Sequence, residues 1–419
     1  MSSFAIWRTA SQQLLQFAAR NLLRNKRRTS VTAFSIAVGF AALALFAGYT
    51  MNVYIGMSMQ AMYGEMLGHI TIAKRGMALE GRMHPEKYLF TAKEIAAISD
   101  GVKQVQDKAS FAPRLAVNGL VSNGKVSTIF FAEGIAPQDM AALRGPRAFP
   151  GSVLEADKAG SVMVANGLMS MLGLKEGADM SLLGSTLTGQ ANALDAQVLY
   201  SFDTGSTATN DKLLFIPLEM ARSLYDAAGR ADRLTVVLPQ DTPLEETRNR
   251  IVAKLAPLGL DLEVQTWQEL SMFFSRVKGM YDMIFAFMFV IVLVISVMAL
   301  VNVIGMNVIE RTREIGSLRA LGMRRNGVVR VFVLEAALMV LLGCAMGMLL
   351  TLALRFGINA ADISYIPPAS TDKVPLSIGL NLPMVAGIAL ILMILGAFAA
   401  WLTATRAVRQ PIIVALGHV

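Results

Sequence analysis

Four long apolar stretches constrain the fold of this chain more than any other feature of its sequence. Each is long enough to cross the hydrocarbon core of a bilayer as an α-helix, which takes about 20 residues. They cover residues 31–53, 283–308, 331–354 and 384–403. Only 16% of the residues are charged, against about 25% in ordinary soluble proteins. The sequence therefore predicts an α-helical membrane protein with four transmembrane helices.

A mixed polar and apolar segment of about 220 residues separates the first two stretches and is large enough to bury a core of its own. Its residue patterns indicate strands at 68–73, 161–165, 178–183, 213–216, 233–238 and 262–265, and helices at 166–172, 217–225 and 242–256. These patterns predict a large α+β domain with two lobes, inserted between transmembrane helices 1 and 2. Residues 267–280 are amphipathic and predict a helix that continues into the second stretch.

Basic residues cluster on one side of the predicted membrane. They are Arg20, Arg24, Lys26, Arg27 and Arg28 before the first stretch, several within 309–330, and Arg406 and Arg409 after the last. The connection 356–383 carries Lys373 alone. Because cytoplasmic loops are enriched in Lys and Arg, both termini and 309–330 are predicted to be cytoplasmic, with the large domain on the other side. The net charge of +8 thus indicates membrane orientation and no nucleic-acid partner.

A short segment between the second and third stretches combines charge with helical periodicity. Ile315, Leu318 and Leu321 recur every three to four residues, and Gly322 suits the left-handed residue that ends a helix. A cytoplasmic helix between two membrane spans has little to pack against except another protein. We therefore interpret it as a coupling segment that receives force from a partner. The residues assigned to it are Glu310, Arg311, Arg313, Glu314, Ile315, Leu318, Arg319, Leu321 and Gly322.

Methionines are frequent after the first apolar stretch, where a helix is predicted to continue through residues 51–66. Those that recur on or near one helical side are Met51, Met57, Met59, Met62 and Met66. They predict a flexible apolar surface for cargo, or ordinary packing. A third interpretation is Cu(I) ligation by thioethers with His69 and His84 nearby.

Glu335 is the one acidic residue inside an apolar stretch. It lies about one turn into the third stretch and near Arg330, which favours a structural anchor in the membrane over a proton relay. Gly39, Gly48, Gly343 and Gly347 predict faces for close helix packing, and Cys344 predicts an apolar filler.

Nucleotide and catalytic sites are not predicted on this chain. Residues 184–189 have the glycine spacing of a phosphate loop, but Gln190 and Ala191 stand where that loop needs Lys and Ser or Thr. The predicted spans hold one carboxylate and no histidine, so no acid–base pair for catalysis is expected there. We expect no metal and no cofactor on the chain itself.

The sequence Glu310-Arg-Thr-Arg-Glu-Ile-Gly-Ser-Leu-Arg-Ala-Leu-Gly322, followed by Phe332-Val-Leu-Glu-Ala336, resembles the cytoplasmic helix and third span of FtsX-like permeases. Residues 164–179 and 19–28 are similar to further segments of that family. These permeases belong to ABC transporters of the macrolide-exporter and lipoprotein-releasing kind. The resemblance implies a bacterial inner-membrane protein that pairs with a second permease, a copy or a paralogue, and with a cytoplasmic ABC ATPase dimer that holds ATP and Mg²⁺. We expect that ATPase to be a separate chain.

With the large domain in the periplasm, the expected plan follows the chain in order. It consists of a cytoplasmic amphipathic helix at 1–29, transmembrane helix 1 at 30–54, a periplasmic α+β domain with helical stalks at 55–275, transmembrane helix 2 at 276–308, the coupling helix at 309–329, transmembrane helix 3 at 330–355, a periplasmic loop at 356–382, transmembrane helix 4 at 383–405 and a cytoplasmic tail at 406–419.

The expected function is mechanical. ATP-driven movement of the coupling segment would change the periplasmic domain and extract or translocate a lipoprotein or lipid-like cargo, with membrane lipids and a periplasmic carrier or adaptor as further partners. Export of a peptide, toxin or antibiotic stays open, as does regulation of a periplasmic enzyme without transport.

Overall fold

The computed structural model describes residues 20, 26–81, 83–148, 151–156, 158, 160–204, 208–239, 242–310, 323–366 and 373–408. The chain divides into two compact units. The first contains residues 1–53, 278–364 and 375–419, and the second contains residues 54–277 and 365–374.

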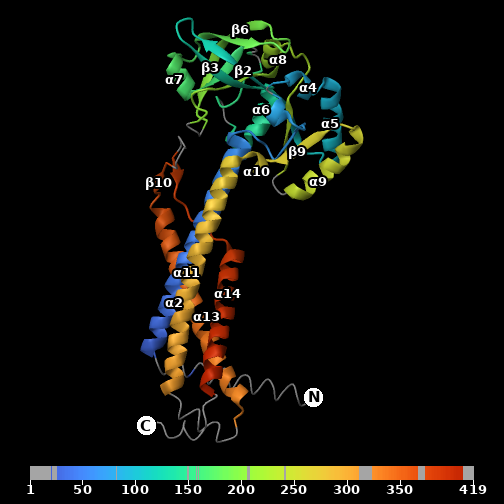
Figure 1. The fold of residues 1–419 in the computed structure, drawn as a ribbon. Helices are drawn as coiled ribbons and strands as arrows, with labels where there is room; N and C mark the ends of the chain where they lie inside the picture. Colours follow the sequence, from blue (N-terminus) through green and yellow to red (C-terminus); the bar gives the residue numbers. More distant parts are fainter. Residues whose placement is uncertain are drawn as a thin grey trace. The chain divides into compact units, whose positions relative to one another are not determined.

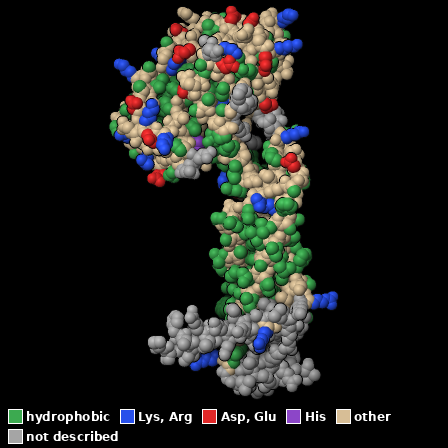
Figure 2. All heavy atoms as spheres, turned by 180° about the vertical axis from the view of Figure 1, so that it is seen from behind, with side chains coloured by type: hydrophobic (Ala, Val, Ile, Leu, Met, Phe, Trp, Pro, Cys, Tyr) green, Lys and Arg blue, Asp and Glu red, His purple; other side chains and the backbone are tan. Residues whose placement is uncertain are grey.

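Four long helices carry the apolar stretches in the described part of the chain (Figure 1). They are α2 (Lys26–Met59), α11 (Met272–Glu310), α13 (Arg325–Ala360) and α14 (Leu382–Val408). All four are long and apolar enough to cross a membrane. Figure 2 shows apolar side chains covering the visible face of these helices, whereas most charged side chains lie on the domain. The chain is thus a membrane protein with four apolar helices and a large α/β domain.

The helices of the first unit share one buried cluster. Ile36, Phe40 and Leu43 of α2 pack in it with Phe332 of α13 and Leu392 of α14. Lipid tails are as apolar as these side chains, so close van der Waals packing holds such a cluster together more than the hydrophobic effect does.

A nine-stranded sheet forms the centre of the second unit. Its strands are β1 (Ile70–Lys74), β2 (Ser110–Ser122), β3 (Ser127–Ile135), β4 (Ser161–Ala165), β5 (Asp179–Ser185), β6 (Ala191–Phe202), β7 (Leu213–Pro217), β8 (Arg233–Val237) and β9 (Leu262–Thr266). Their order is β3-β7-β4-β6-β5-β2-β8-β1-β9, and β2 also pairs with β3. That extra pairing closes six strands into a barrel, which leaves those strands without free edges.

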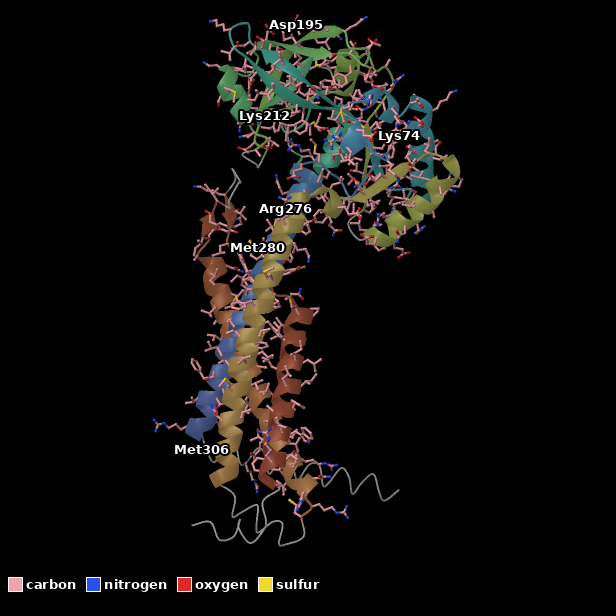
Figure 3. The ribbon with its side chains drawn as sticks, viewed as in Figure 1. Lys74, Asp195, Lys212, Arg276, Met280 and Met306 are labelled. Atoms are coloured by element: carbon pink, nitrogen blue, oxygen red, sulfur yellow. The ribbon has the colours of Figure 1, made fainter. Side chains whose placement is uncertain are left out.

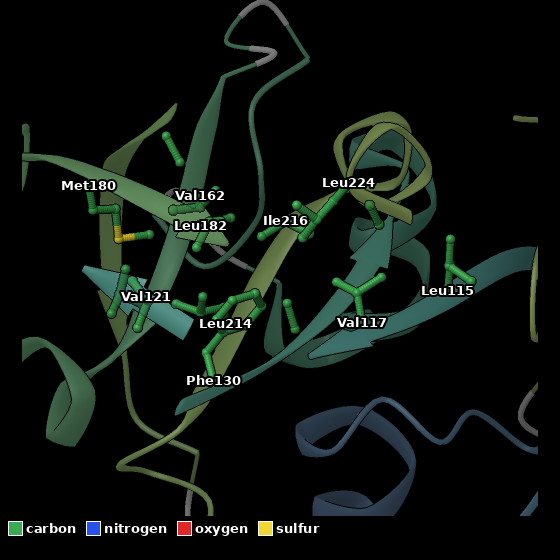
Figure 4. Close-up of a cluster of buried hydrophobic side chains, with 14 of the residues drawn as sticks. Leu115, Val117, Val121, Phe130, Val162, Met180, Leu182, Leu214, Ile216 and Leu224 are labelled. Atoms are coloured by element: carbon green, nitrogen blue, oxygen red, sulfur yellow. The ribbon is translucent and has the colours of Figure 1, made fainter. Parts of the chain in front are cut away.

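The barrel encloses the larger buried core of the domain (Figure 4). Val117, Phe130, Leu182 and Leu214 point into it from four different strands. Helices α7 (Asn166–Leu172) and α8 (Leu218–Tyr225) add Leu168 and Leu224 to the same cluster. Buried and exposed residues alternate along β3 and β5, as expected for strands with one face toward a core.

The remaining strands form a second lobe. The β8-β1-β9 sheet packs under α5 (Ala92–Val105) and α9 (Leu244–Leu255), and Ile72, Ile98 and Ile251 are fully buried between them. Strand β2 joins the two lobes because Ser110–Arg114 pairs with β8 while Arg114–Ser122 pairs with β3. The prediction of two lobes agrees with these two separate cores.

Shorter elements complete the described chain. They are the π-helix η1 (Gln60–Gly64), the helices α3 (Met77–Glu80), α4 (Pro85–Tyr88), α6 (Pro137–Arg144) and α10 (Trp267–Leu270), the 3-10 turns η2 (Gly145–Arg147) and η3 (Ala256–Leu258), and the two-residue strands β10 (Ser364–Tyr365) and β11 (Val374–Pro375).

The six strands predicted for the domain and the helices predicted at 166–172, 217–225 and 242–256 are confirmed, most within one or two residues. Residues 184–189 cover the end of β5 and the turn that leads into β6, which differs from the strand-to-helix turn of a phosphate loop. The helix predicted from residue 267 was wrong at its start. Ser271 leaves helical geometry with ψ of 86°, so that α10 ends there and α11 begins at Met272.

Candidate functional site

The coupling segment lies almost entirely outside the described residues. Glu310 is the last residue of α11, and the description resumes at Met323, just before α13 begins at Arg325. Arg311, Arg313, Glu314, Ile315, Leu318, Arg319, Leu321 and Gly322 fall within the gap. The coupling role of these residues therefore stays a prediction. The described structure shows the elements on either side of them.

Helix α13 packs against α2 through two glycines, as predicted. A Cβ atom on Gly343 would lie 2.7 Å from Cβ of Ile36, and one on Gly347 would lie 2.8 Å from the carbonyl oxygen of Ala37. Such distances require that something shifts, so only glycine lets the two helices approach this closely. The same holds for Gly39 of α2, where an added Cβ would meet Val292 of α11 at 2.8 Å. Helix α2 is thus packed tightly against both α11 and α13.

Glu335 is buried in the bundle at 4% exposure. It lies on α13 beside Phe332 and Ala336, which belong to the buried cluster shared with α2 and α14. A buried carboxyl in an apolar helix face restricts how that helix can rotate or slide. This placement is compatible with the anchor role, which stays a prediction. Cys344 is buried in the same cluster.

The methionines predicted as a cargo surface do not share one exposed face. Helix α2 continues directly into the π-helix η1, so the predicted helix through residue 66 is confirmed as far as Gly64 but changes its period at Gln60. Met66 is fully buried against Ile135 and Met140. Met57 and Met62 pack against a buried aromatic cluster, while Met51 is 41% exposed. The π-turn breaks the periodicity on which the prediction depended, and Met66 cannot belong to a cargo surface.

The copper interpretation gains no support from the histidines. His69 Nδ1 accepts a hydrogen bond of 3.2 Å from the Leu238 N–H, and His84 is exposed beside Glu86. Burial lowers the pKa of His69, which keeps its ring neutral. Among the described residues, no group of three His, Cys, Asp or Glu side chains could hold a metal ion.

An aromatic cluster joins the domain ends of α2 and α11 within the second unit. The Tyr54 ring of α2 meets the Phe274 ring of α11 edge-on with centroids 6.2 Å apart, and Phe274 meets Trp267 at 4.7 Å. Trp267 and Phe274 are buried together with Ala61. Edge-to-face pairs of this kind add about 0.5–1.5 kcal/mol to the effect of burial. The end of α2 and the start of α11 are therefore fastened to each other.

Four charged side chains form an ion network in the same unit, which the sequence patterns did not indicate. Arg114 and Asp232 are buried, and Glu133 and Arg233 are half-buried. Arg114 donates to Glu133 at 2.9 Å, Arg233 donates to the same carboxylate, and Arg233 also donates to Asp232 at 2.9 Å. Asp232 in turn accepts the Ala116 N–H at 2.8 Å. These residues lie on β2 and β3 and at the start of β8. The network therefore sits where the barrel and the second lobe meet.

The network is electrically balanced, with two cations and two anions. Burial alone would raise the pKa of Glu133, but Arg114 and Arg233 hold that pKa below its usual range. Burial raises the pKa of Asp232, an effect that Arg233 opposes. Arg114 Nη1 makes one further bond, to the carbonyl oxygen of Met66 at 2.6 Å. That bond connects the network to the segment that follows α2.

A family model described as the FtsX-like permease C-terminal domain matches residues 286–412. The chain is 21% identical over 353 residues to an uncharacterised ABC transporter permease of Methanocaldococcus jannaschii, covering 83% of this chain and 84% of that protein. It is 24% identical over 373 residues to the pyoverdine export ATP-binding/permease protein PvdT of Pseudomonas entomophila, covering 85% of this chain and 54% of that protein. It is 28% identical over 149 residues to the macrolide export ATP-binding/permease protein MacB of Chromobacterium violaceum, covering 35% of this chain and 23% of that protein.

Among solved structures, the periplasmic region of MacB from Actinobacillus actinomycetemcomitans aligns with 50% of this chain and 92% of that chain, at 14% identity and a TM-score of 0.36. The chain spans about half or less of the two ATP-binding/permease relatives. The matched permease domain begins within α11 and continues through α13 and α14. This chain carries an FtsX-like permease C-terminal domain, and its relatives are ABC transporter permeases that include MacB.

Proposed function

We propose that this chain is the permease subunit of an ABC transporter whose ATPase is a separate cytoplasmic protein. ATP binding and hydrolysis on that partner, which holds the ATP and Mg²⁺, would move the coupling segment and change the conformation of the large domain. The chain would lie in a bacterial inner membrane with both termini in the cytoplasm and the large domain in the periplasm. It would work together with a second permease, either a copy of itself or a paralogue.

The observation that carries this proposal is the continuity of α11. It is one helix of 39 residues, and its last residue, Glu310, is the first of the residues assigned to the coupling segment. Its first turn contains Phe274, which packs on the aromatic cluster at the end of α2. A continuous α-helix transmits displacement along its axis, because its backbone hydrogen bonds run from one end to the other. A push on the coupling segment would therefore reach the domain end of the helix.

The proposed cargo is a lipoprotein or another lipid-like molecule, taken from the outer face of the inner membrane. Two of the relatives are named for the export of pyoverdine and of macrolides, so export of a small molecule or peptide with a periplasmic adaptor is the alternative. Met51 remains the exposed member of the methionine group. It is the one position of that group at which a cargo contact can be tested directly.

The coupling role is tested with Leu318→Asp and Leu321→Asp together, in the full chain co-expressed with its ATPase subunit. A charged residue in an apolar contact is costly to bury, so the double variant should insert into the membrane and lose ATPase binding. The matched control is Val252→Asp with Leu258→Asp, at two exposed apolar positions of the domain. Equal ATPase binding by both double variants would refute the coupling role.

A second function, mechanical regulation of a periplasmic enzyme without cargo, is favoured by the burial of Met66 and the packing of Met57 and Met62. Native mass spectrometry of the purified complex separates the two. A lipoprotein or lipid that is bound before ATP is added and released afterwards supports transport. A complex that retains only a periplasmic protein partner supports regulation.

A further inference from the structure

We propose that Arg114 is a positioning residue that locks the end of α2 to the junction between the two lobes of the domain, so that displacement of α2 moves both lobes. The proposal rests on the proposed mechanical function. Its physical basis is the bond from Arg114 to the Met66 carbonyl and the ion network behind it.

The segment after α2 is a short and constrained connection. The N–H groups of Leu67 and Gly68 donate back to the carbonyls of Ala61 and Met62, both at 3.1 Å. Met66 has a φ of +52°, a left-handed conformation that non-glycine residues adopt only when their surroundings enforce it. Its side chain is fully buried. The connection therefore has little freedom to stretch when α2 moves.

Gly68 brings this connection into direct contact with β8. Its φ is +63°, and a Cβ atom there would lie 2.5 Å from Cγ2 of Thr235 and 2.9 Å from the carbonyl oxygen of Val236. Only glycine fits such a conformation against another strand. The connection is thus seated on the second lobe before β1 begins.

Arg114 occupies the one residue of β2 that pairs with both lobes. It is opposite Arg233 of β8 on one side and opposite Ile135 of β3 on the other. Its Nη1 donates a hydrogen bond to the carbonyl oxygen of Met66, and its Nη2 donates one to the carboxylate of Glu133 on the barrel strand β3. The planar guanidinium fixes the directions of both bonds, which a lysine cannot do. One side chain therefore ties the α2 connection, the barrel and the second lobe together.

Stability alone does not account for this arrangement. Replacing a buried ion pair by well-packed apolar residues is often neutral or stabilising, whereas removing one partner is destabilising. Arg114 is 3% exposed and Asp232 is 1% exposed, so their charges are costly to keep in the interior. An apolar contact could fill the same volume but could not fix the position of the Met66 carbonyl. The geometry thus indicates that Arg114 positions the Met66 carbonyl.

The test replaces Arg114→Met and Glu133→Leu together. This variant leaves the Arg233–Asp232 pair balanced and keeps an apolar core, but loses the bond to Met66. The matched control removes the exposed pair Arg75–Asp261, whose Nε–Oδ1 distance is 2.8 Å, as Arg75→Met with Asp261→Asn. Each variant is studied as the full chain with its co-expressed ATPase in lipid nanodiscs.

Two measurements are made on each variant. Amide hydrogen exchange measures how strongly the N–H groups of Leu67 and Gly68 are protected. The N–H of Phe130 in the barrel serves as the reference for global folding. Spin labels at position 55 on α2 and position 125 on the β2–β3 turn, in a Cys344→Ala background, report the distance between α2 and the barrel with and without ATP and vanadate.

We expect the Arg114→Met/Glu133→Leu variant to exchange Leu67 and Gly68 about 10- to 100-fold faster, the range for losing a hydrogen bond to a charged group. It should also lose the ATP-dependent distance change while ATP hydrolysis stays within about twofold of the unmodified chain. Unchanged protection of both amides together with a normal distance change would overturn the proposal.

Failure of the proposed function looks different. If the unmodified chain shows no ATP-dependent distance change, the mechanical function is wrong, but the exchange measurement still decides whether Arg114 holds the joint. If Phe130 also loses protection, the double variant has not folded. Arg114→Lys then decides by the same measurements, because it keeps the charge and cannot donate to Met66 and Glu133 in the fixed fork.

Discussion

Replacing Gly347 by alanine tests the packing of α2 on α13, which connects the coupling segment to the rest of the bundle. The added Cβ would lie 2.8 Å from the Ala37 carbonyl oxygen and 2.8 Å from Cδ1 of Phe40. The first atom is backbone, so the helices must separate. Overpacking of this kind costs about 1–3 kcal/mol, while Ala gains about 1 kcal/mol over Gly in helix propensity. The net change in the free energy of unfolding is therefore about 0 to −2 kcal/mol.

Gly387→Ala in α14 is the matched control, because a Cβ atom there meets nothing within 4 Å. Both variants gain the same helix propensity, so the difference between them isolates the overpacking, about 1–3 kcal/mol. The assay is equilibrium unfolding of the full chain in mixed detergent micelles, followed by tryptophan fluorescence. Gly347→Ala should unfold at a lower denaturant concentration than Gly387→Ala. Equal midpoints would show that α2 and α13 do not pack through Gly347.

Three further predictions concern single side chains. Burial lowers the pKa of His69, so near pH 6 the unfolded chain binds more protons than the folded one. The stability that neutral His69 contributes is complete above about pH 6.5 and should fall as the pH drops. Unfolding midpoints at pH 7.5 and 5.5 should show this loss in the unmodified chain and not in His69→Gln. Thr91→Ala removes the N-cap that binds the Glu94 N–H and should cost about 1 kcal/mol, seen as faster amide exchange in the first turn of α5. Glu335→Gln should lower the unfolding midpoint in detergent without changing the pH dependence of transport, and a shifted pH profile would contradict the anchor role.

Local patterns in the sequence were enough to predict the apolar helices and part of the domain, whereas the strands β2, β3 and β6 and the helix α5 were not predicted. Residues 161–165 and 166–172 were assigned correctly as β4 and α7 because an apolar run gives way to helical spacing at Asn166. Gly343 and Gly347 were likewise predicted as a packing face, since small residues one turn apart have few other uses in an apolar helix.

The barrel could not be predicted because its closure depends on pairings that are distant in sequence. Strand β2 contains Pro113 and Gly119, which usually interrupt strands. In the structure, a Cβ on Gly119 would lie 2.0 Å from the Leu183 carbonyl oxygen of β5, so this glycine permits the close approach that completes the barrel. The same limit applies to Arg114, whose partner Glu133 is 19 residues away and itself bonds Arg233, a further 100 residues on. No local pattern marks such a network.

The two helices that enter the domain are exposed to very different degrees within the membrane unit. In the apolar stretch of α2, 56% of the residues are buried, whereas in that of α11 only 6% are buried. Large apolar residues are exposed along most of α11: Met280, Met283, Ile284, Phe287, Val290, Ile291, Val294, Ile295, Met298, Val301 and Met306. Figure 3 labels Met280 and, further along the same helix, Met306. Helix α2 is thus the more buried of the two helices, and the exposed apolar side chains of α11 are the ones that lipid or another helix would cover.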